Sequence, residues 1–291
     1  MPRRPRLHAP GLLYHLMVRG NNDQAIFLNA ADYEACLRAL QTTRERYPFA
    51  LYAYVLMPNH LHLLLEVGRA STGRVMQAFL TGYARRFNRV HRRRGHVFQG
   101  RYKAIICERD KYLLALVRYI HLNPVRAGLV KRPGDWQWSG HGEYLGRVQR
   151  RLIEPGPVRG QLPTPARYEA FVREGMKEGY RAEWHPSESA PFLGTEQFVK
   201  RVAKRRESSF VPHPPSLERL WEEVAEHVGL SREALRSGGR SMRLVEARDG
   251  FIRRAVFEAG YQAMTVASFI GCHASNVSRA LQKEVSAWEE Y

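Results

Sequence analysis

The sequence has 291 residues, a length typical of about two domains, and 44% of them are hydrophobic, enough for a packed core. Lys and Arg total 46 against 28 Asp and Glu, so the formal net charge of +18 favours a polyanionic partner, most simply nucleic acid. The three scattered cysteines, Cys36, Cys107 and Cys272, exclude a disulfide framework and a C-x-x-C metal pair. The sequence has no apolar leader and no membrane-length apolar run, so we expect a cytoplasmic, nucleoid-associated protein without a membrane partner.

The first half of the chain alternates between the apolar periods of strands and helices. Strands are predicted over residues 12–18, 49–57, 61–67 and 97–107, and helices over residues 29–47 and 72–90. The β-α-β-β-α-β order is typical of a ferredoxin-like split β-α-β sheet, in which the first and third strands are central. We therefore predict an α+β domain over residues 1–150.

Two histidines stand one residue apart at the third predicted strand. Because side chains alternate between the faces of a strand, His60 and His62 point to one side, and the leucines that alternate with them point to the other. Neutral imidazole is the commonest protein metal ligand, so the pair forms half of a metal site. The alternative is that one or both are ordinary surface or core histidines.

A basic cluster without a single acidic residue lies between Ala84 and Lys103, beginning inside the second predicted helix and continuing past its end. Its members are Arg85, Arg86, Arg89, Arg92, Arg93, Arg94, Arg101 and Lys103. A solvated helix face normally mixes both signs of charge, so this cluster indicates binding of nucleic-acid phosphates. The interleaved aromatic residues favour core positions, with stacking on unpaired bases as the alternative.

A further helix is predicted over residues 110–123, with Asp110 as its N-cap. Tyr119 and Asn123 are four residues apart and therefore share a helix face. Pro124 places Asn123 near the helix end. The amide oxygen of Asn123 can complete a three-ligand metal site with the two histidines, which places the Tyr119 phenol beside the ion as a nucleophile.

Three segments in this order, MPNHLHLLLEV, GHVFQGRYKA and RYIHLNPVRAGLV, resemble the REP-associated tyrosine transposases, where REP stands for repetitive extragenic palindrome. These belong to the HUH single-tyrosine transposase superfamily, and the resemblance covers residues 8–150. Asn123 stands where related insertion-sequence enzymes carry Gln. The resemblance implies Mg²⁺ or Mn²⁺ bound by His60, His62 and Asn123, with Tyr119 as the catalytic nucleophile.

The same resemblance implies that Tyr119 forms a 5′-phosphotyrosine intermediate on single-stranded DNA carrying REP-type hairpins. It also implies a monomer or weak dimer. We therefore expect a metal-dependent single-stranded DNA endonuclease and strand transferase. Two alternatives stay open: a DNA-binding protein derived from a transposase without cleavage activity, and a metal phosphodiesterase that uses water.

The second half of the chain divides into a linker and a helical module. Residues 151–215 are rich in Pro, Gly and basic residues, so we predict a basic linker with short helices. Residues 216–291 are predicted to form a separate all-α helix-turn-helix domain, in which the segment over 247–283 resembles the C-terminal DNA-binding domain of the replication initiator DnaA. The expected contacts with duplex DNA lie at the start of its recognition helix, at Ser275, Asn276, Ser278 and Arg279.

Overall fold

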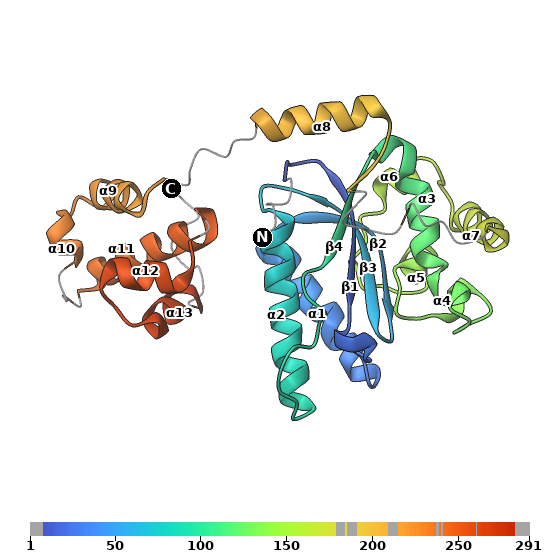
Figure 1. The fold of residues 1–291 in the computed structure, drawn as a ribbon, viewed down its shortest axis with the longest axis horizontal. Coiled ribbons are helices and arrows are strands. Elements are labelled where there is room, and N and C mark those ends of the chain that lie inside the picture. The colour runs from blue at the N-terminus through green and yellow to red at the C-terminus, as the bar shows by residue number, and fades with distance from the viewer. Residues whose placement is uncertain are drawn as a thin grey trace. The chain divides into compact units, whose positions relative to one another are not determined.

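A computed structural model of the chain describes residues 8–178, 184, 191–208, 215–236, 239, 241–259 and 261–282. The chain divides into two units, Met1–Ser209 and Phe210–Tyr291, each with its own internal packing. Figure 1 shows a sheet with helices in the first unit and helices in the second. Each unit is described below by itself.

A five-stranded sheet forms the centre of the first unit. Its strands are β1 (Leu13–Arg19), β2 (Phe49–Met57), β3 (His60–Val67), β4 (Lys103–Cys107) and β5 (Phe192–Leu193). The order across the sheet is β2-β3-β1-β4-β5, antiparallel except for the parallel pair β4–β5. The predicted α+β class and the central positions of the first and third strands are therefore confirmed.

Helices cover both faces of this sheet. The helices α1 (Ala30–Arg46) and α2 (Thr72–Val90) lie on one face, and α3 (Arg109–His121) lies on the other (Figure 1). The side chains of Asn29 and Ser71 cap α1 and α2 by accepting hydrogen bonds from backbone N–H groups in the first turn. The leucines of β3 that alternate with the histidines are fully buried, which leaves the histidines on the α3 face.

Two element ends differ from the sequence prediction. The strand β4 begins at Lys103 rather than at Val97, because Gly100 adopts a positive φ of 61° and turns the chain before the ladder starts. The helix α3 ends at His121, and Asn123 opens the short helix α4 (Asn123–Arg126). Asp110 lies in the first turn of α3, whose N-cap is Glu108.

The expected linker after residue 150 differs most from its prediction, since its described residues pack onto the first unit. Its elements are α6 (Gly156–Arg159), α7 (Pro165–Glu174), the 3₁₀ turn Gly175–Lys177, β5 and α8 (Glu196–Ser208). The apolar residues between the prolines are buried in the core of the sheet unit, namely Leu152, Val158, Tyr168, Val172, Leu193, Phe198 and Val202. Proline occupies the first turn of α6 and α7, where its missing N–H costs nothing. The Pro and Gly residues accompany turns and helix starts, and short helices of the kind that the sequence predicted are present.

Three further short elements complete the first unit. They are the 3₁₀ turns Asn21–Asp23 and Pro133–Asp135 and the helix α5 (His141–Tyr144). The backbone N–H of Leu56 donates to the Trp138 carbonyl, so the chain before α5 borders the outer strand β2.

The second unit consists of helices around a core of its own. They are α9 (Leu217–His227), α10 (Arg232–Arg236), α11 (Met242–Arg253), the π-helical turn Arg254–Glu258, α12 (Ala263–Ile270) and α13 (Ala274–Gln282). Trp221 and Phe251 are buried at its centre with ring centroids 4.7 Å apart. Part of the expected stretch between the units, residues 209–214, lies outside the described residues. Among the described residues no helix is long and apolar enough to cross a membrane.

Candidate catalytic site and nucleic-acid surfaces

The histidine pair lies on β3 with both rings on the face that α3 covers. The ring centroids of His60 and His62 are 5.2 Å apart and their planes are nearly perpendicular, at 81°. His62 is fully buried, whereas His60 is half-buried at the strand end. The pair therefore presents one inner and one outer imidazole to the same space.

Each of the two rings is held through its Nδ1 atom. His60 Nδ1 lies 2.7 Å from Asn59 Oδ1, and Asn59 Nδ2 donates to the Asp23 carbonyl. Since a carbonyl only accepts, this bond turns Asn59 Oδ1 toward His60 and requires His60 Nδ1 to donate. His62 Nδ1 lies 2.9 Å from Nε2 of His15, a histidine on β1. In both rings Nε2 is the nitrogen outside these bonds, so the pair fits a divalent cation that coordinates through Nε2.

Tyr119 lies on the same face of the sheet, near the end of α3. Its ring centroid is 6.1 Å from that of His15 and 5.4 Å from that of Trp184, both edge-on. The guanidinium carbon of Arg126 lies 4.9 Å from the centre of the Tyr119 ring, and Arg126 Nη1 donates to the Tyr119 carbonyl. The tyrosine is buried, with 1% of its surface exposed. The expected nucleophile and the histidine pair are thus neighbours of one residue, His15.

Asn123 makes its side-chain hydrogen bonds to the end of α3. Its Nδ2 donates to the carbonyls of Tyr119 and Ile120, at 3.0 and 3.3 Å. The amide nitrogen is therefore engaged by the backbone, and Oδ1 is the side-chain atom suited to a cation. Within the described residues no group of three His, Cys, Asp or Glu side chains forms a metal site. A cation on the histidine pair would therefore need another kind of third ligand, such as an amide oxygen.

His121 belongs to a separate buried cluster and not to the site. Its Nδ1 lies 2.5 Å from the Tyr168 hydroxyl, which is also 3.3 Å from His141 Nδ1. Burial lowers the pKa of His121 well below its ordinary value, and the neighbouring His141 lowers it further. Burial, followed by the charge of Arg147, lowers the pKa of His141 to about 4. Both imidazoles are therefore neutral at pH 7.

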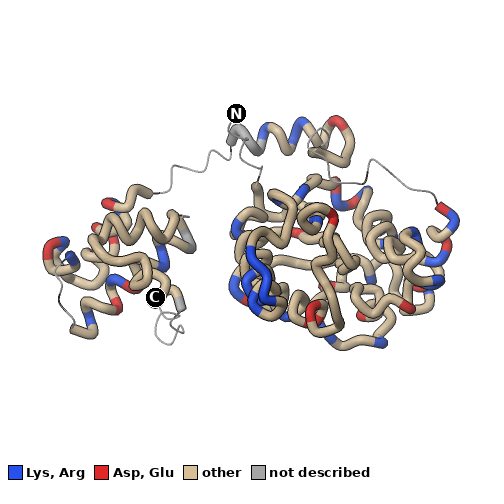
Figure 2. Tube along the Cα trace, turned by 60° about the horizontal axis from the view of Figure 1, so that its bottom comes forward, with Lys and Arg blue, Asp and Glu red and all other residues tan. Residues whose placement is uncertain are grey.

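The basic cluster forms an exposed surface on the first unit. Six of its eight members are exposed, namely Arg85, Arg89, Arg92, Arg94, Arg101 and Lys103. Three consecutive arginines produce an uninterrupted blue stretch in Figure 2. Among the neighbouring aromatic residues, Tyr83, Phe87 and Tyr102 are buried in the core, so the core interpretation holds for them.

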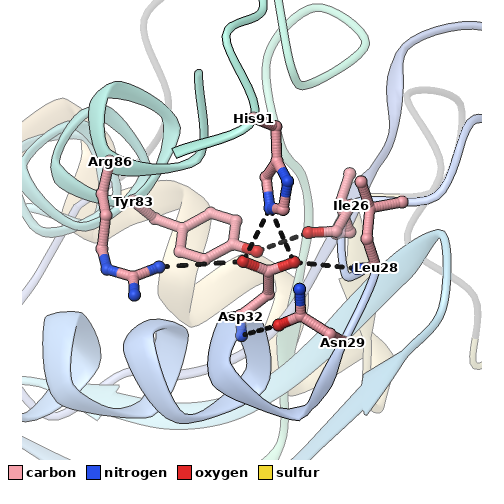
Figure 3. Close-up of polar contacts among 7 residues, drawn as sticks. All are labelled: Ile26, Leu28, Asn29, Asp32, Tyr83, Arg86 and His91. Carbon is pink, nitrogen blue, oxygen red and sulfur yellow. Dashed lines mark hydrogen bonds and ion pairs between the residues drawn. The ribbon is translucent and has the colours of Figure 1, made fainter. Parts of the chain in front are cut away.

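The two remaining members of the cluster are partly engaged within the protein. Arg93 Nη2 donates to Gln24 Oε1 at 2.7 Å. Arg86 lies 3.7 Å from the buried carboxylate of Asp32 at the start of α1, as Figure 3 shows. Asp32 also contacts His91 Nε2 with both oxygens at 2.9 Å and accepts from the Leu28 N–H. The contacts of Asp32 connect the end of α2 to the start of α1 and so hold the helix that bears the first part of the basic cluster.

The second unit presents a helix, a turn and a second helix at its C-terminal end. Gly271 between α12 and α13 has a φ of 74°, a left-handed conformation that glycine adopts without strain. Ser275, Asn276, Ser278 and Arg279 are all exposed on α13, whereas the residues between them pack into the core of this unit. Arg279 Nη2 donates to Asn276 Oδ1 at 2.9 Å. The four polar side chains are accessible together, and their contact with DNA stays a prediction.

Three residues of the site were absent from the sequence prediction: His15, Arg126 and Trp184. His15 is a single histidine in an apolar strand, so periodicity alone gives it no chemical role. Its signal is topological: in the predicted order β1 lies beside β3, which brings a side chain on the same face near the pair. Arg126 follows the irregular end of α3. Trp184 belongs to the segment that was expected to be a linker.

Comparison with known proteins finds similarity over part of the first unit. A family model described as "Transposase IS200 like" matches residues 9–123. This match agrees with the resemblance to tyrosine transposases that the sequence shows over this part of the chain.

One known protein is similar in sequence to part of the chain. It is described as "Putative REP-associated tyrosine transposase" from Haemophilus influenzae and is 30% identical over 112 residues. The alignment covers 35% of this chain and 64% of that relative, so the chain spans less than two thirds of its length.

Two solved structures are similar to part of the chain. A REP-associated tyrosine transposase bound to a REP hairpin is 22% identical, with a TM-score of 0.43, and the match covers 50% of this chain and 87% of the other. A protein titled "putative transposase" from Deinococcus radiodurans R1 is 17% identical, with a TM-score of 0.31, over 40% of this chain and 94% of the other.

Proposed function

We propose that the first unit cleaves and rejoins single-stranded DNA through Tyr119. The observation that carries the proposal is the position of His15, which contacts the buried histidine of the pair on one side and the Tyr119 ring on the other. Tyr119 is thus connected through His15 to a histidine pair suited to hold a cation, and a nucleophile close to a cation site suits a phosphotyrosine reaction. The match of residues 9–123 to a transposase family supports the same reading.

Each residue of the site has a separate part in this reaction. His60 and His62 would hold a Mg²⁺ or Mn²⁺ ion, with the Asn123 amide oxygen as a third ligand. Such an ion would polarise the scissile phosphate and offset charge in the transition state. The Tyr119 oxygen attacks phosphorus as the bond to the 3′ oxygen breaks; the phenol loses its proton and the released 3′ oxygen gains one. The 5′-phosphotyrosine that results stores the bond for rejoining.

Arg126 is proposed to support the nucleophile through its contact with the Tyr119 ring. Its guanidinium lies over the Tyr119 ring, where a cation stabilises the negative charge that develops on the phenol oxygen. Arg126 Nε and Nη2 are buried and, among the described residues, have no hydrogen-bond partner. Because buried donors are normally satisfied, these two N–H groups suit a phosphate oxygen of bound DNA.

The proposed substrate is single-stranded DNA that carries a REP-type hairpin. The name of the Haemophilus influenzae relative connects that protein to such elements, and the exposed arginines of the basic cluster suit a phosphate backbone. The helix-turn-helix of the second unit is proposed to bind duplex DNA with the exposed face of α13. We propose that the protein acts in the cytoplasm, on the DNA of the nucleoid.

One gel experiment separates this proposal from its alternatives. The full chain is incubated with end-labelled hairpin single strands and Mn²⁺ and is then denatured in detergent. We expect a covalent protein–DNA adduct that Tyr119→Phe abolishes, since only the hydroxyl is removed. The matched control is Tyr112→Phe on the same helix, which should leave the adduct unchanged.

The two other outcomes identify the alternatives. Cleavage that survives Tyr119→Phe without an adduct indicates a phosphodiesterase that uses water. Retarded but uncut DNA indicates a binding protein without cleavage activity. His60→Ala should abolish the adduct and largely preserve retardation, and an equal loss of both would contradict a metal role for this histidine.

A further inference from the structure

We propose that His15 is a positioning residue that fixes the tautomer of His62. In this tautomer His62 carries its hydrogen on Nδ1 and presents the lone pair of Nε2 to the reaction space. The inference rests on the proposed function only in that it takes His62 as a cation ligand.

The backbone carbonyl of Trp184 has a fixed role in hydrogen bonding. The backbone carbonyl oxygen of Trp184 lies 2.8 Å from His15 Nδ1. A carbonyl oxygen only accepts hydrogen bonds, so His15 Nδ1 carries the hydrogen and donates. A neutral imidazole with its hydrogen on Nδ1 has a lone pair on Nε2, and His15 Nε2 is therefore an acceptor.

The hydrogen bond between His15 and His62 then determines which nitrogen of His62 carries the hydrogen. His15 Nε2 and His62 Nδ1 are 2.9 Å apart, a hydrogen-bond distance. Since His15 Nε2 accepts, His62 Nδ1 donates, and the lone pair of neutral His62 lies on Nε2. The opposite tautomer of His62 would bring two lone pairs together at 2.9 Å. Both side chains are fully buried, so water cannot satisfy either nitrogen, and leaving the bond between them unmade would be unfavourable.

His60 reaches the same state through a different neighbour. Asn59 Oδ1 accepts from His60 Nδ1, which also places the His60 lone pair on Nε2. The two members of the pair thus present the same nitrogen, although one is oriented by a loop amide and the other by a strand imidazole. Metal-binding histidines generally donate their second ring N–H to a fixed acceptor, which sets both ring orientation and tautomer.

The position of His15 in the sheet makes it suitable for this role. On the central strand β1 it is opposite Leu64 of β3, one same-face position along from His62, and its other neighbour is Ile105 of β4. Strands on both sides hold its backbone. The imidazole is the only ordinary side chain that accepts at one end and donates at the other across a ring, so it transmits the orientation of the carbonyl to His62 without a net charge.

The first test reads the tautomer directly in the metal-free full chain. Histidine labelled with ¹⁵N gives separate Nδ1 and Nε2 signals whose couplings to ring hydrogens identify the protonated nitrogen. We expect the signals of His62, assigned by their loss in His62→Gln, to show hydrogen on Nδ1. In His15→Leu we expect a mixture of tautomers or a shift to hydrogen on Nε2, and in His15→Gln, whose amide can both accept and donate, the wild-type form.

The second test measures Mn²⁺ affinity by electron paramagnetic resonance in the absence of DNA. His15→Leu should weaken binding by about 10- to 100-fold, the usual effect of removing the partner of a metal-bound histidine. His15→Gln should restore most of this loss, which a purely structural role would not do. Met17→Leu, on the same strand and face opposite His62, controls for repacking.

Two results would overturn the inference: hydrogen on Nε2 of His62 in the wild-type chain, or an unchanged His62 tautomer in a folded His15→Leu variant. These outcomes are independent of the proposed function. If wild-type protein binds no Mn²⁺ but His62 carries hydrogen on Nδ1, the metal-dependent function fails while the tautomer assignment holds.

Discussion

Tyr119 is surrounded by side chains of three different kinds. The edges of His15 and Trp184 meet its ring, and the guanidinium of Arg126 lies over it. Burial lowers the pKa of Arg126 more than its neighbours change it, and the nearby Tyr119 acts in the opposite direction. A cation held against a phenol offsets negative charge on it, so Arg126 is placed to stabilise the charge that would develop on the Tyr119 oxygen in the proposed reaction.

The pH dependence of stability should reveal the buried histidines His121 and His141. Their pKa values are lowered in the folded state, to about 4 for His141, so the unfolded chain binds more protons below pH 6.5, the ordinary value. Their contribution to stability is therefore complete above about pH 6.5 and is lost as the pH falls toward 4, by up to about 1.4 kcal/mol per pH unit for each group.

Urea unfolding at pH 7, 6 and 5 measures this loss. His141→Phe should flatten the dependence because one titrating group is removed, whereas the exposed His96→Gln should leave it unchanged. A slope in His141→Phe equal to that of the wild type would show that this histidine does not contribute to the acid sensitivity.

At the scale of elements, regular apolar patterns predicted the helices and strands, whereas several residues of the candidate site lie at irregular ends of these elements. The helix starting at Ala30 and the strand ending at Met57 follow directly from apolar periodicity and capping residues. The break between α3 and α4 could not be predicted, because Leu122 continues with nearly helical angles while the next turn begins at Asn123. The contact of His15 with His62 depends on strand register, which only the folded sheet fixes.

The segment after residue 150 shows why composition misled the prediction. Pro and Gly indicate interruptions of regular structure but do not reveal whether the apolar residues between them find a core. Here Tyr168 and Val172 on α7 are buried, and Leu193 extends the sheet through β5. Trp184, in the same segment, reaches the site. A ring contact with Tyr119 therefore comes from the segment whose composition predicted a basic linker with short helices.

The junction of α1 and α2 predicts a large effect from a single substitution. Asp32→Ala should destabilise the first unit by about 3 kcal/mol, because it leaves the Leu28 N–H, His91 and Arg86 without their carboxylate (Figure 3). Thermal or urea unfolding measures the change. The control is Asp23→Ala, whose carboxylate pairs with Arg19 at the surface and should matter far less. Equal effects of both substitutions would contradict a structural role for the buried carboxylate.

At the scale of the whole molecule, the net charge of +18 has one clear focus in the exposed arginines at the end of α2 and in the segment that follows it. A protein that neutralises phosphates releases counterions, so its affinity falls with salt in proportion to the number of contacts. The second unit has a core of its own, so its exposed α13 face can be tested as a separate contributor to DNA binding.

The salt dependence of binding to single-stranded hairpins should report the basic cluster. Replacing Arg85, Arg89 and Arg92 together with Gln should reduce the slope of log affinity against log salt by about 2, since each phosphate contact on single strands contributes about 0.7. Fluorescence anisotropy over a range of KCl concentrations gives this slope. Lys131→Gln, an exposed cation outside the cluster, is the control. A slope unchanged by the triple substitution would place the DNA elsewhere on the protein.

The near-complete burial of Tyr119 has a consequence for encounters with stray DNA. No phosphodiester can touch the hydroxyl until the side chains around it have yielded, so arrival and reaction are separate events. Only strands that hold on long enough gain the exposed form, and the observed affinity is reduced by the rarity of that form. Under the proposed function, the burial of Tyr119 would spare transient single strands, such as those behind a replication fork, from accidental nicking.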